Sequence, residues 1–324
     1  MKSVVKNAAI TAAGALAASV LFAAPAVAYV RYVTDSGKPF QWQQTCVEIT
    51  GYPNADDFPD MTSDEVQTAA SGAANAWSSA SLACTYLTID VTLSSATPPT
   101  AVADKKSSLI FRHKDWCSPS DSPWTCSYDP SALAITSVFV TRSTGRIQEA
   151  DIEVNDKWFS WTDLDLHPDD KTKQDLQNAL THEMGHLIGL DHTCFTPSGN
   201  LVRPNDNNGN PVPDCATAPA DVRATTMFAS ATPGDLSKRT LEPDDQQAVC
   251  DIYPLASDPA YCPTTNATSN GTSSSSLLGK GGCALAGVGD GRFGSLIGAV
   301  SLAAAMVAMG LRRRRRPRAG CAPR

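Results

Sequence analysis

Apolar residues recur along the chain with the periods of helices and strands. From Thr62 to Ala80 they follow one another in steps of three and four residues, which predicts an early amphipathic helix. Thr62 and Glu65 at its start have the spacing of a capping box. The run Ile135–Val140 predicts a strand, and the alternation of apolar and polar residues within Gly145–Asn155 predicts another, half-buried strand.

Two more helices are predicted in the second half of the chain. Leucines between residues 176 and 187 recur at helical spacing, and Asp169–Asp170 upstream are candidates for the N-terminal cap of this helix. Gly189 is expected to end it, because glycine adopts left-handed backbone conformations at little cost. A closing helix is predicted at Asp244–Tyr253, where three apolar residues share one face.

Both ends of the chain carry apolar segments that are typical of sorting signals. Residues 1–28 have a basic start, an apolar run and small residues before Tyr29, which predicts a secretory signal peptide; a retained membrane helix is the alternative. Phe293–Leu311 is a run of 19 residues without a charge, long enough to span a bilayer as a helix. The cluster Arg312–Arg316 that follows favours a cytoplasmic C-terminus.

A linker rich in Thr, Ser and Gly, over residues 263–282, separates the body of the chain from this apolar segment. The linker, Gly282–Cys283, the apolar helix and the arginines follow one another in an order that resembles the MYXO-CTERM sorting tail of certain Gram-negative bacteria. The resemblance implies that residues 283–324 are a sorting tail, processed near Cys283, which retains the protein at the cell surface or outer membrane before any release. An uncleaved single-pass anchor is the alternative.

The net charge of −7 is unevenly distributed along the chain. Residues 29–279 hold 15 Lys and Arg against 32 Asp and Glu, a net charge of −17, and nine of the other 11 basic residues lie at or after Lys280. Proteins that bind nucleic acid usually present a basic face. The acidic body of this chain therefore excludes DNA or RNA as its expected principal partner.

The cysteines agree with export. Eight of the ten lie within residues 29–262, and an even number in an exported domain predicts disulfides. Short loops favour the pairs Cys117–Cys126 and Cys194–Cys215, and the other pairings stay open. Zinc binding by cysteines is not favoured, because the chain has no Cys-x-x-Cys pair.

The residues that carry chemistry are concentrated between His182 and His192. His182 and His186 are four residues apart on the predicted helix, so both imidazoles project from one face, where a single zinc ion can accept both. After the break at Gly189, His192 can return to the metal as a third ligand, and Glu183 lies beside the metal without being a ligand. Three histidines leave the fourth zinc position to water, which is the arrangement of a catalytic site.

The pattern H-E-x-x-H-x-x-G-x-x-H of residues 182–192 is the signature of the metzincin metallopeptidases, so the chain resembles that family. The resemblance implies one catalytic Zn²⁺ on the three histidines and Glu183 as the general base that takes a proton from the attacking water. Metzincins have a methionine in a tight turn beneath the zinc, and Met227 fits that place. Leu241–Pro254 resembles the closing helix of the matrixins within that family.

The resemblance extends in weaker form over the expected peptidase domain, residues 29–262. It implies an α/β (α+β) fold class: a twisted mixed sheet with two main helices and a small C-terminal subdomain that contains the closing helix. Gly145–Asn155 resembles the matrixin edge strand that borders the substrate cleft. Extended peptides are expected to lie along it, at four residues: Ile152, Glu153, Val154 and Asn155.

Three features depart from the matrixin pattern. Nothing after Tyr29 matches the pro-segment whose cysteine caps the zinc, so latency by a cysteine switch is not expected. The 34 residues between His192 and Met227 are a long connection, and it includes Asn205–Asn210. Side-chain oxygens there are suited to Ca²⁺, although an ordinary Asn/Gly turn is the favoured interpretation. Phe228 after the methionine leaves the specificity pocket undefined.

These features predict a zinc endopeptidase that is secreted or anchored at the cell surface, acts on protein or peptide substrates and is monomeric. Two other hypotheses remain: a surface-displayed binding or adhesion module on a catalytically inert metzincin scaffold, and a tail-anchored structural protein with an accidental motif. The presence of all three histidines and Glu183 opposes the first, because a decayed enzyme often loses one of them, and undetectable metal after refolding with zinc would favour the second. The isolated His113 and His167 are expected to be surface residues.

Overall fold

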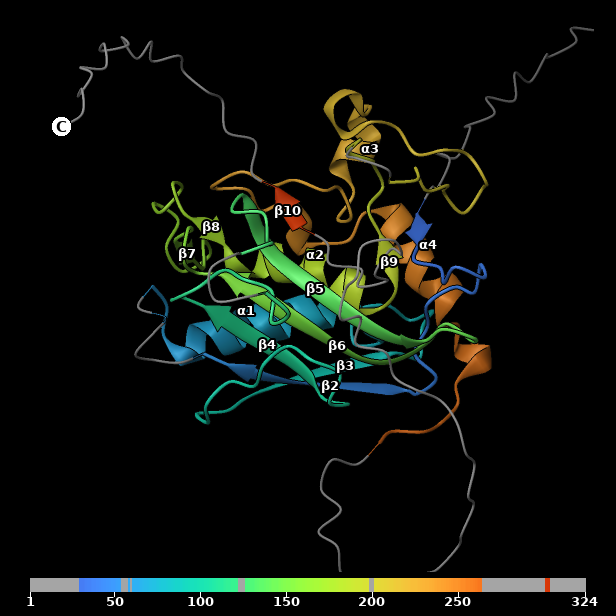
Figure 1. Ribbon diagram of the computed structural model, residues 1–324, viewed down its shortest axis with the longest axis horizontal. Coiled ribbons are helices and arrows are strands. Elements are labelled where there is room, and N and C mark those ends of the chain that lie inside the picture. Colours follow the sequence, from blue (N-terminus) through green and yellow to red (C-terminus); the bar gives the residue numbers. More distant parts are fainter. Residues whose placement is uncertain are drawn as a thin grey trace, which may run out of the picture.

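The computed structural model describes residues 29–53, 58, 60–121, 126–197, 201–263 and 301–303 (Figure 1). The expected signal peptide (residues 1–28), the linker beyond residue 263 and most of the expected sorting tail lie outside the described residues. In the described part of the chain, no helix is both long enough and apolar enough to cross a membrane.

A mixed β-sheet of five main strands forms the centre of the molecule. Its strands lie in the order β5-β6-β4-β2-β3, and all neighbouring pairs are parallel except β5 and β6, which are antiparallel. The mixed strand direction and the coarse α+β class therefore agree with expectation. The strands are β2 (Cys46–Tyr52), β3 (Thr88–Leu93), β4 (Ser107–Arg112), β5 (Ala132–Thr141) and β6 (Arg146–Asn155).

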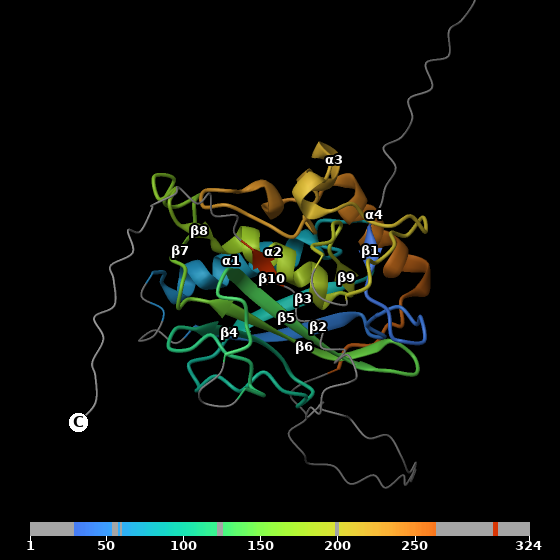
Figure 2. The ribbon, with the colours of Figure 1, turned by 45° about the horizontal axis from the view of Figure 1, so that its top comes forward.

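Two long helices, α1 (Ser63–Ala76) and α2 (Leu176–Leu187), pack side by side on one face of this sheet (Figures 1 and 2). The capping box expected for α1 is present: Glu65 N donates to Thr62 Oγ1, and Thr62 N donates to Glu65 Oε2. The helix ends at Ala76, four residues before the expected end. Trp77 follows as its C-terminal cap, and the buried indole Nε1 donates to Thr181 O of α2 at 2.7 Å.

The N-terminal cap of α2 is Asp175 and not the expected Asp169–Asp170. The Asp175 carboxylate accepts a hydrogen bond from Asn178 N at 2.8 Å, which satisfies one of the free amides of the first turn. The same carboxylate also accepts hydrogen bonds from Arg239, whose guanidinium binds Asp163 and Asp165 as well. This arginine connects the start of α2 to the segment that precedes the closing helix.

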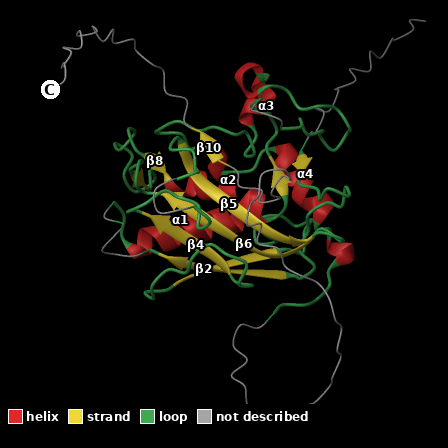
Figure 3. Ribbon diagram, in the orientation of Figure 1, coloured by secondary structure: helices red, strands yellow, loops and turns green. Residues whose placement is uncertain are grey.

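Short elements and loops make up the C-terminal part of the domain (Figure 3). The closing helix is α4 (Pro243–Ile252), which lies within one residue of its predicted bounds. The buried Tyr253 follows it and donates its hydroxyl to Ile188 O at 2.7 Å, so the closing helix supports the end of α2. The other short elements are β1 (Val30–Arg31), β7 (Trp161–Thr162), β8 (Gln174–Asp175), β9 (Leu190–Asp191), α3 (Ala220–Ala224) and the 3₁₀ turns Cys215–Thr217, Ser237–Arg239 and Leu255–Ser257.

Four disulfides connect the eight cysteines of the domain. The two expected pairs, Cys117–Cys126 and Cys194–Cys215, are confirmed. The other two, Cys46–Cys262 and Cys84–Cys250, join segments that are far apart in the sequence. Because disulfides persist in oxidising compartments, four of them indicate an exported or extracellular protein.

The expectation that Ile152–Asn155 belong to an edge strand is wrong. They end β6, which pairs with β4 on one side and with β5 on the other, so the strands at the two margins of the five-strand sheet are β5 and β3. A three-residue strand, β10 (Ser301–Ala303), pairs antiparallel with the outer edge of β5. These three residues are therefore extended where the sequence predicted a helix; the rest of the segment 293–311 lies outside the described residues.

Buried carboxyl groups on one face of β6 give a prediction about stability. The Asp151 side chain is 2% exposed and accepts a hydrogen bond from Ser108 N at 3.0 Å. Burial, followed by the charge of Glu149, raises the pKa of Asp151 to about 8. A carboxyl whose pKa is higher in the folded state stabilises the fold fully below its unfolded pKa of about 3.9 and loses this contribution as pH rises through the folded pKa.

We therefore expect Asp151→Asn to raise the free energy of unfolding relative to wild type by up to about 5 kcal/mol at pH 8 and to leave it nearly unchanged near pH 4, since the pKa of Asp151 is raised by about four units and one unit is worth about 1.4 kcal/mol. Urea unfolding at both pH values measures the difference. The control is Asp90→Asn, which changes an exposed residue of β3. Parallel pH profiles of wild type and Asp151→Asn would contradict the assignment.

Candidate metal centre

Helix α2 carries three of the four residues expected at the site. His182, Glu183 and His186 are each 0% exposed, so the helix presents them to the interior of the protein. The helical spacing of four residues places the two imidazoles on successive turns of one face, with ring centroids 4.7 Å apart. The local sequence thus determines the first half of the site through helix geometry alone.

Gly189 ends the helix and turns the chain back, as expected. Its φ angle is +98°, in the left-handed region that favours glycine. The following strand β9 pairs antiparallel with β1, with Leu190 opposite Arg31 and Asp191 opposite Val30. This pairing fixes the direction in which His192 leaves the strand.

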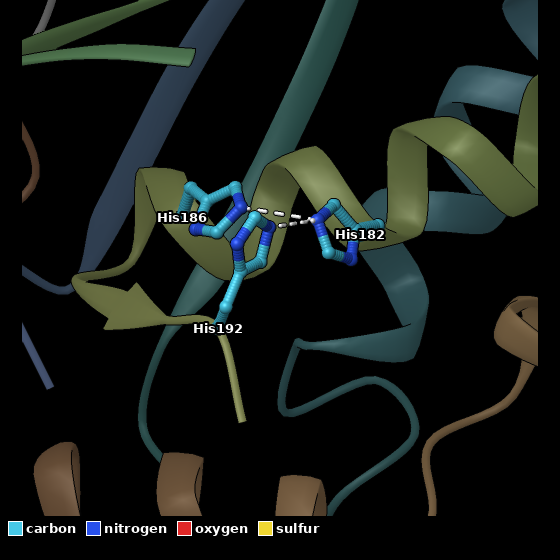
Figure 4. Close-up of side chains that lie close together, drawn as sticks. All are labelled: His182, His186 and His192. Carbon is cyan, nitrogen blue, oxygen red and sulfur yellow. Dashed lines mark hydrogen bonds between the residues drawn. The ribbon is translucent and has the colours of Figure 1, made fainter. Parts of the chain in front are cut away.

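The three histidines converge on a common point (Figure 4). The Nε2 atoms of His182 and His192 are 3.1 Å apart, and those of His182 and His186 are also 3.1 Å apart. One nitrogen of each ring lies within 4.8 Å of those of the other two. A tetrahedral zinc ion with Zn–N bonds of about 2.0–2.1 Å separates its nitrogen ligands by about 3.3 Å. The spacing therefore suits one ion of this size.

The hydrogen bonds of the ring Nδ1 atoms determine which nitrogens face the common point. His182 Nδ1 is 2.7 Å from Thr226 O, and His186 Nδ1 is 2.8 Å from Leu190 O. A carbonyl oxygen only accepts, so both Nδ1 atoms carry the proton, and both Nε2 atoms present a lone pair. Burial holds the pKa values of all three histidines below their usual range, which keeps the rings neutral. Lone pairs at 3.1 Å repel unless a cation lies between them, so this donor set fits a divalent metal.

Glu183 is held by a residue that the sequence did not single out. Thr136, buried in β5, donates its hydroxyl to Glu183 Oε2 at 2.6 Å, while Glu183 Oε1 is buried without a hydrogen-bond partner. Burial raises the pKa of Glu183 to about 8, and the hydrogen bond from Thr136 partly opposes this shift. One carboxylate oxygen is thus fixed, and the other remains available to a ligand.

Met227 lies against the helix between the two histidines. A Cβ added to Gly185 would collide with Met227 Sδ and would lie 3.0 Å from the Trp77 ring, so the methionine occupies the space that only glycine leaves open. The sequence placed Met227 near the site but gave no reason for Gly185. A small residue between the two helical histidines is the signal that would have found this contact.

The turn that holds Met227 is fixed by two further charged residues, Asp245 and Lys238. Thr226 N donates to Asp245 Oδ2 at 2.8 Å, and Lys238 Nζ donates to three backbone carbonyls of the turn. Asp245 belongs to the acidic pair that begins the predicted closing helix. Nothing in the sequence pattern distinguishes Lys238 from a surface lysine.

The structure does not bring the four expected substrate residues to a surface. Ile152 and Val154 are core residues; Glu153, which is 0% exposed, binds Arg112 and Tyr128; and Asn155 donates to Ala132 O at 2.7 Å. They are buried because β6 has a neighbouring strand on each side. These buried side chains are therefore not placed to contact a substrate, which corrects the expectation. The strand that lies beside Glu183 is β5, through Thr136.

The isolated histidines and the Asn-rich loop lie elsewhere. His113 and His167 are partly exposed and pair with Asp156 and Glu65, which agrees with surface roles. In the Asn205–Asn210 loop, Asp206 Oδ1 accepts hydrogen bonds from two backbone amides, those of Asn208 and Asn210. This is the geometry of a side-chain-closed turn. Calcium binding there stays a prediction.

Gly189 offers a test of how the third histidine is placed. A Cβ at this position would lie 2.7 Å from Phe40 O, so Gly189→Ala adds a collision to the cost of a positive φ. We expect it to lower the free energy of unfolding by more than the about 1–3 kcal/mol of such backbone strain and to weaken metal binding. Gly209→Ala is the matched control, because its φ is +83° and nothing lies within 4 Å of the added Cβ. Equal losses of stability and metal affinity in the two variants would contradict the assignment; calorimetry and metal titration measure both.

No protein-family description matches the chain. No curated protein is similar to it. Among solved structures, a chain of the GM1-bound form of the ECX AB5 holotoxin superposes on 70% of this chain and 89% of its own length, with 12% sequence identity and a TM-score of 0.33. Similarity at that level carries no argument about function, which has to be inferred from the residues of the site.

Proposed function

We propose that this protein is an exported, zinc-dependent endopeptidase of the metzincin type, similar to the matrixins. The observation that carries the proposal is the convergence of three neutral imidazoles, each of which directs one ring nitrogen at a common point. Beside them lies the buried Glu183, whose Oε1 has no hydrogen-bond partner. A structural zinc site is normally closed by four protein ligands, whereas three ligands leave a position for water. The donor set therefore favours catalysis over a structural role.

The proposed chemistry divides the work between the metal and the chain. A zinc ion on the three histidines would polarise the scissile carbonyl and lower the pKa of a bound water towards about 7. Glu183 Oε1 accepts the proton of the attacking water and later transfers it to the leaving amine. Thr136 holds Oε2, so that the carboxylate does not rotate away from the reacting atoms. The hydrogen bonds from Nδ1 to backbone carbonyls keep His182 and His186 oriented.

Protein or peptide substrates fit the edge of β5. An extended peptide can add to a sheet edge through main-chain hydrogen bonds, and β5 carries Thr136 and hence runs beside Glu183. Its outer edge already pairs with three residues of this chain, Ser301–Ala303, in antiparallel register. This pairing supports β5, in place of Ile152–Asn155, as the strand that receives the substrate.

Secretion and surface retention complete the proposal. The four disulfides agree with an oxidising compartment, and the signal peptide at residues 1–28 and the sorting tail at residues 283–324 would direct the protein to the cell surface or outer membrane. Mass spectrometry of the mature C-terminus tests the tail. An intact Arg324 would contradict processing near Cys283.

Digestion of a peptide library by the exported protein, read by mass spectrometry, tests the proposed activity. We expect cleavage that a chelator abolishes and that one equivalent of Zn²⁺ restores. A folded protein that binds zinc and cleaves neither casein nor the library would contradict the proposal and favour the binding-module hypothesis. A folded protein that binds no zinc would favour the structural-protein hypothesis.

The role of Thr136 gives a separate prediction. Thr136→Val keeps the shape of the side chain and removes the hydroxyl, and a hydrogen bond to a charged group contributes about 1.5–3 kcal/mol. We expect kcat to fall by about 10- to 100-fold with little change in KM or zinc content. Thr136→Ser restores the hydroxyl and is the control, expected to remain within a few-fold of wild type. Equal kcat values in Thr136→Val and wild type would contradict the role.

A further inference from the structure

Lys238 is a buried lysine whose ammonium points into the backbone of the Met227 turn, residues Thr225–Phe228. The residue is 1% exposed. Its Nζ donates to Thr225 O at 3.2 Å, to Thr226 O at 3.2 Å and to Phe228 O at 2.8 Å. These three carbonyls use all three donors of the ammonium group, so Lys238 holds three backbone positions of the turn at once.

A buried ammonium group is costly, and Lys238 forms no ion pair with any described residue that would offset the cost. Asp235 and Asp245 favour the charge only from a greater distance, and burial lowers the pKa of Lys238 to about 8. A methionine or leucine could fill the same space without this cost. The three hydrogen bonds to backbone carbonyls are therefore the interactions that account for an ammonium group at this buried position.

One of these carbonyls is also the partner of a proposed zinc ligand. Thr226 O accepts a hydrogen bond from His182 Nδ1 at 2.7 Å and another from the Lys238 ammonium. The amide of the same residue, Thr226 N, donates to Asp245 Oδ2 at 2.8 Å. The Lys238 ammonium thus binds the carbonyl of Thr226, and the Asp245 side chain binds its amide.

The backbone of Lys238 is attached to the zinc helix itself. Lys238 N donates to Asn178 Oδ1 at 2.7 Å, and both residues are buried. Asn178 precedes His182 by four residues on α2, so the two lie one turn apart on the same face. Lys238 therefore connects the helix that carries His182 with the carbonyl that orients the His182 ring.

We propose that Lys238 is a positioning residue that fixes the Thr226 carbonyl and thereby orients the His182 imidazole towards the metal. This inference rests on the proposed zinc site and adds to it a residue outside the H-E-x-x-H-x-x-G-x-x-H pattern. The carbonyl–histidine bond selects the tautomer with the free lone pair on Nε2, and loss of such an outer partner costs about 10- to 100-fold in metal affinity.

Lys238→Met in the full-length protein tests the inference, because methionine keeps the length of the side chain and removes the donors. We expect the zinc dissociation constant, measured by competition with a chromophoric chelator, to rise by about 10- to 100-fold. The visible absorption spectrum of the Co²⁺-loaded variant should also differ from that of the wild type, since one imidazole is reoriented. Lys171→Met is the matched control on an exposed lysine and should change neither.

A merely structural role predicts a different result. In that case Lys238→Met lowers the unfolding temperature while the zinc dissociation constant and the Co²⁺ spectrum stay at their wild-type values, and this outcome overturns the inference. Should Lys238→Met fail to fold, Asn178→Ala removes only the attachment of the Lys238 backbone to α2. It is expected to weaken zinc binding by several-fold, and an unchanged dissociation constant in folded Asn178→Ala overturns the inference as well.

These measurements remain independent of hydrolysis. A wild-type protein that binds zinc and cleaves no peptide contradicts the proposed endopeptidase, while the comparison of Lys238→Met with wild type still decides the role of Lys238. A folded wild-type protein that binds neither Zn²⁺ nor Co²⁺ overturns both.

Discussion

Glu183→Gln is expected to bind zinc as tightly as the wild-type protein and to hydrolyse peptides about 10²- to 10⁴-fold more slowly, the range for removal of a general base. Glutamine has nearly the same shape and can still accept the hydroxyl of Thr136, which lies 2.6 Å from Glu183 Oε2. Its amide group cannot take a proton from water. The three histidines are unchanged, so the metal site should stay intact.

Steady-state kinetics and metal analysis of the same preparation measure this effect. Glu48→Gln makes the same substitution at an exposed position of β2 and is the control, expected to have wild-type turnover. Turnover of Glu183→Gln within a few-fold of wild type would show that another group takes the proton. Loss of zinc from this variant would instead assign Glu183 to the structure of the site.

His192→Ala is expected to lose zinc and with it all measurable hydrolysis. Loss of an outer partner of a metal ligand already costs about 10- to 100-fold in affinity, so loss of one of only three protein ligands should cost more than about 100-fold. His192 follows β9 outside the helix, so its removal leaves the hydrogen bonds of His182 and His186 in place. The fold should therefore persist, as circular dichroism can check.

The isolated histidines provide the control for this experiment. His113→Ala removes an imidazole that pairs with Asp156, away from α2 and β9, and should retain about one zinc per chain. Metal analysis after gel filtration compares the two variants. Equal zinc contents of His192→Ala and His113→Ala would contradict the three-histidine site.

The sequence predicted those features that depend on neighbours close along the chain. The capping box of Thr62 and Glu65, the spacing of the two helical histidines and the break at Gly189 are local, and each is present. The N-terminal cap of α2 was misplaced by several residues, because Asp169, Asp170 and Asp175 are equally good caps in isolation. The contacts of Asp175 with Asn178 and Arg239 decide among them, and the contact with Arg239 is distant in sequence.

Features that depend on distant neighbours were missed. The alternation of residues in β6 indicates a strand but carries no information about how many strands flank it, so the edge was assigned to Ile152–Asn155 and not to β5. Thr136 and Lys238 are polar residues without a motif, and only the folded chain brings them to Glu183 and Thr226. The two disulfides that join distant segments were left open for the same reason.

The Cys46–Cys262 bond determines where a mechanical load would enter the fold. Cys262 is next to the last residue described before the linker, and its partner Cys46 begins β2, which lies between β3 and β4. A force applied to the chain beyond residue 263 therefore passes through the disulfide into β2, an inner strand of the sheet. Helix α4 precedes this bond in the chain, so it does not carry the force while the disulfide is intact. Its contact with the end of α2 should therefore persist under load.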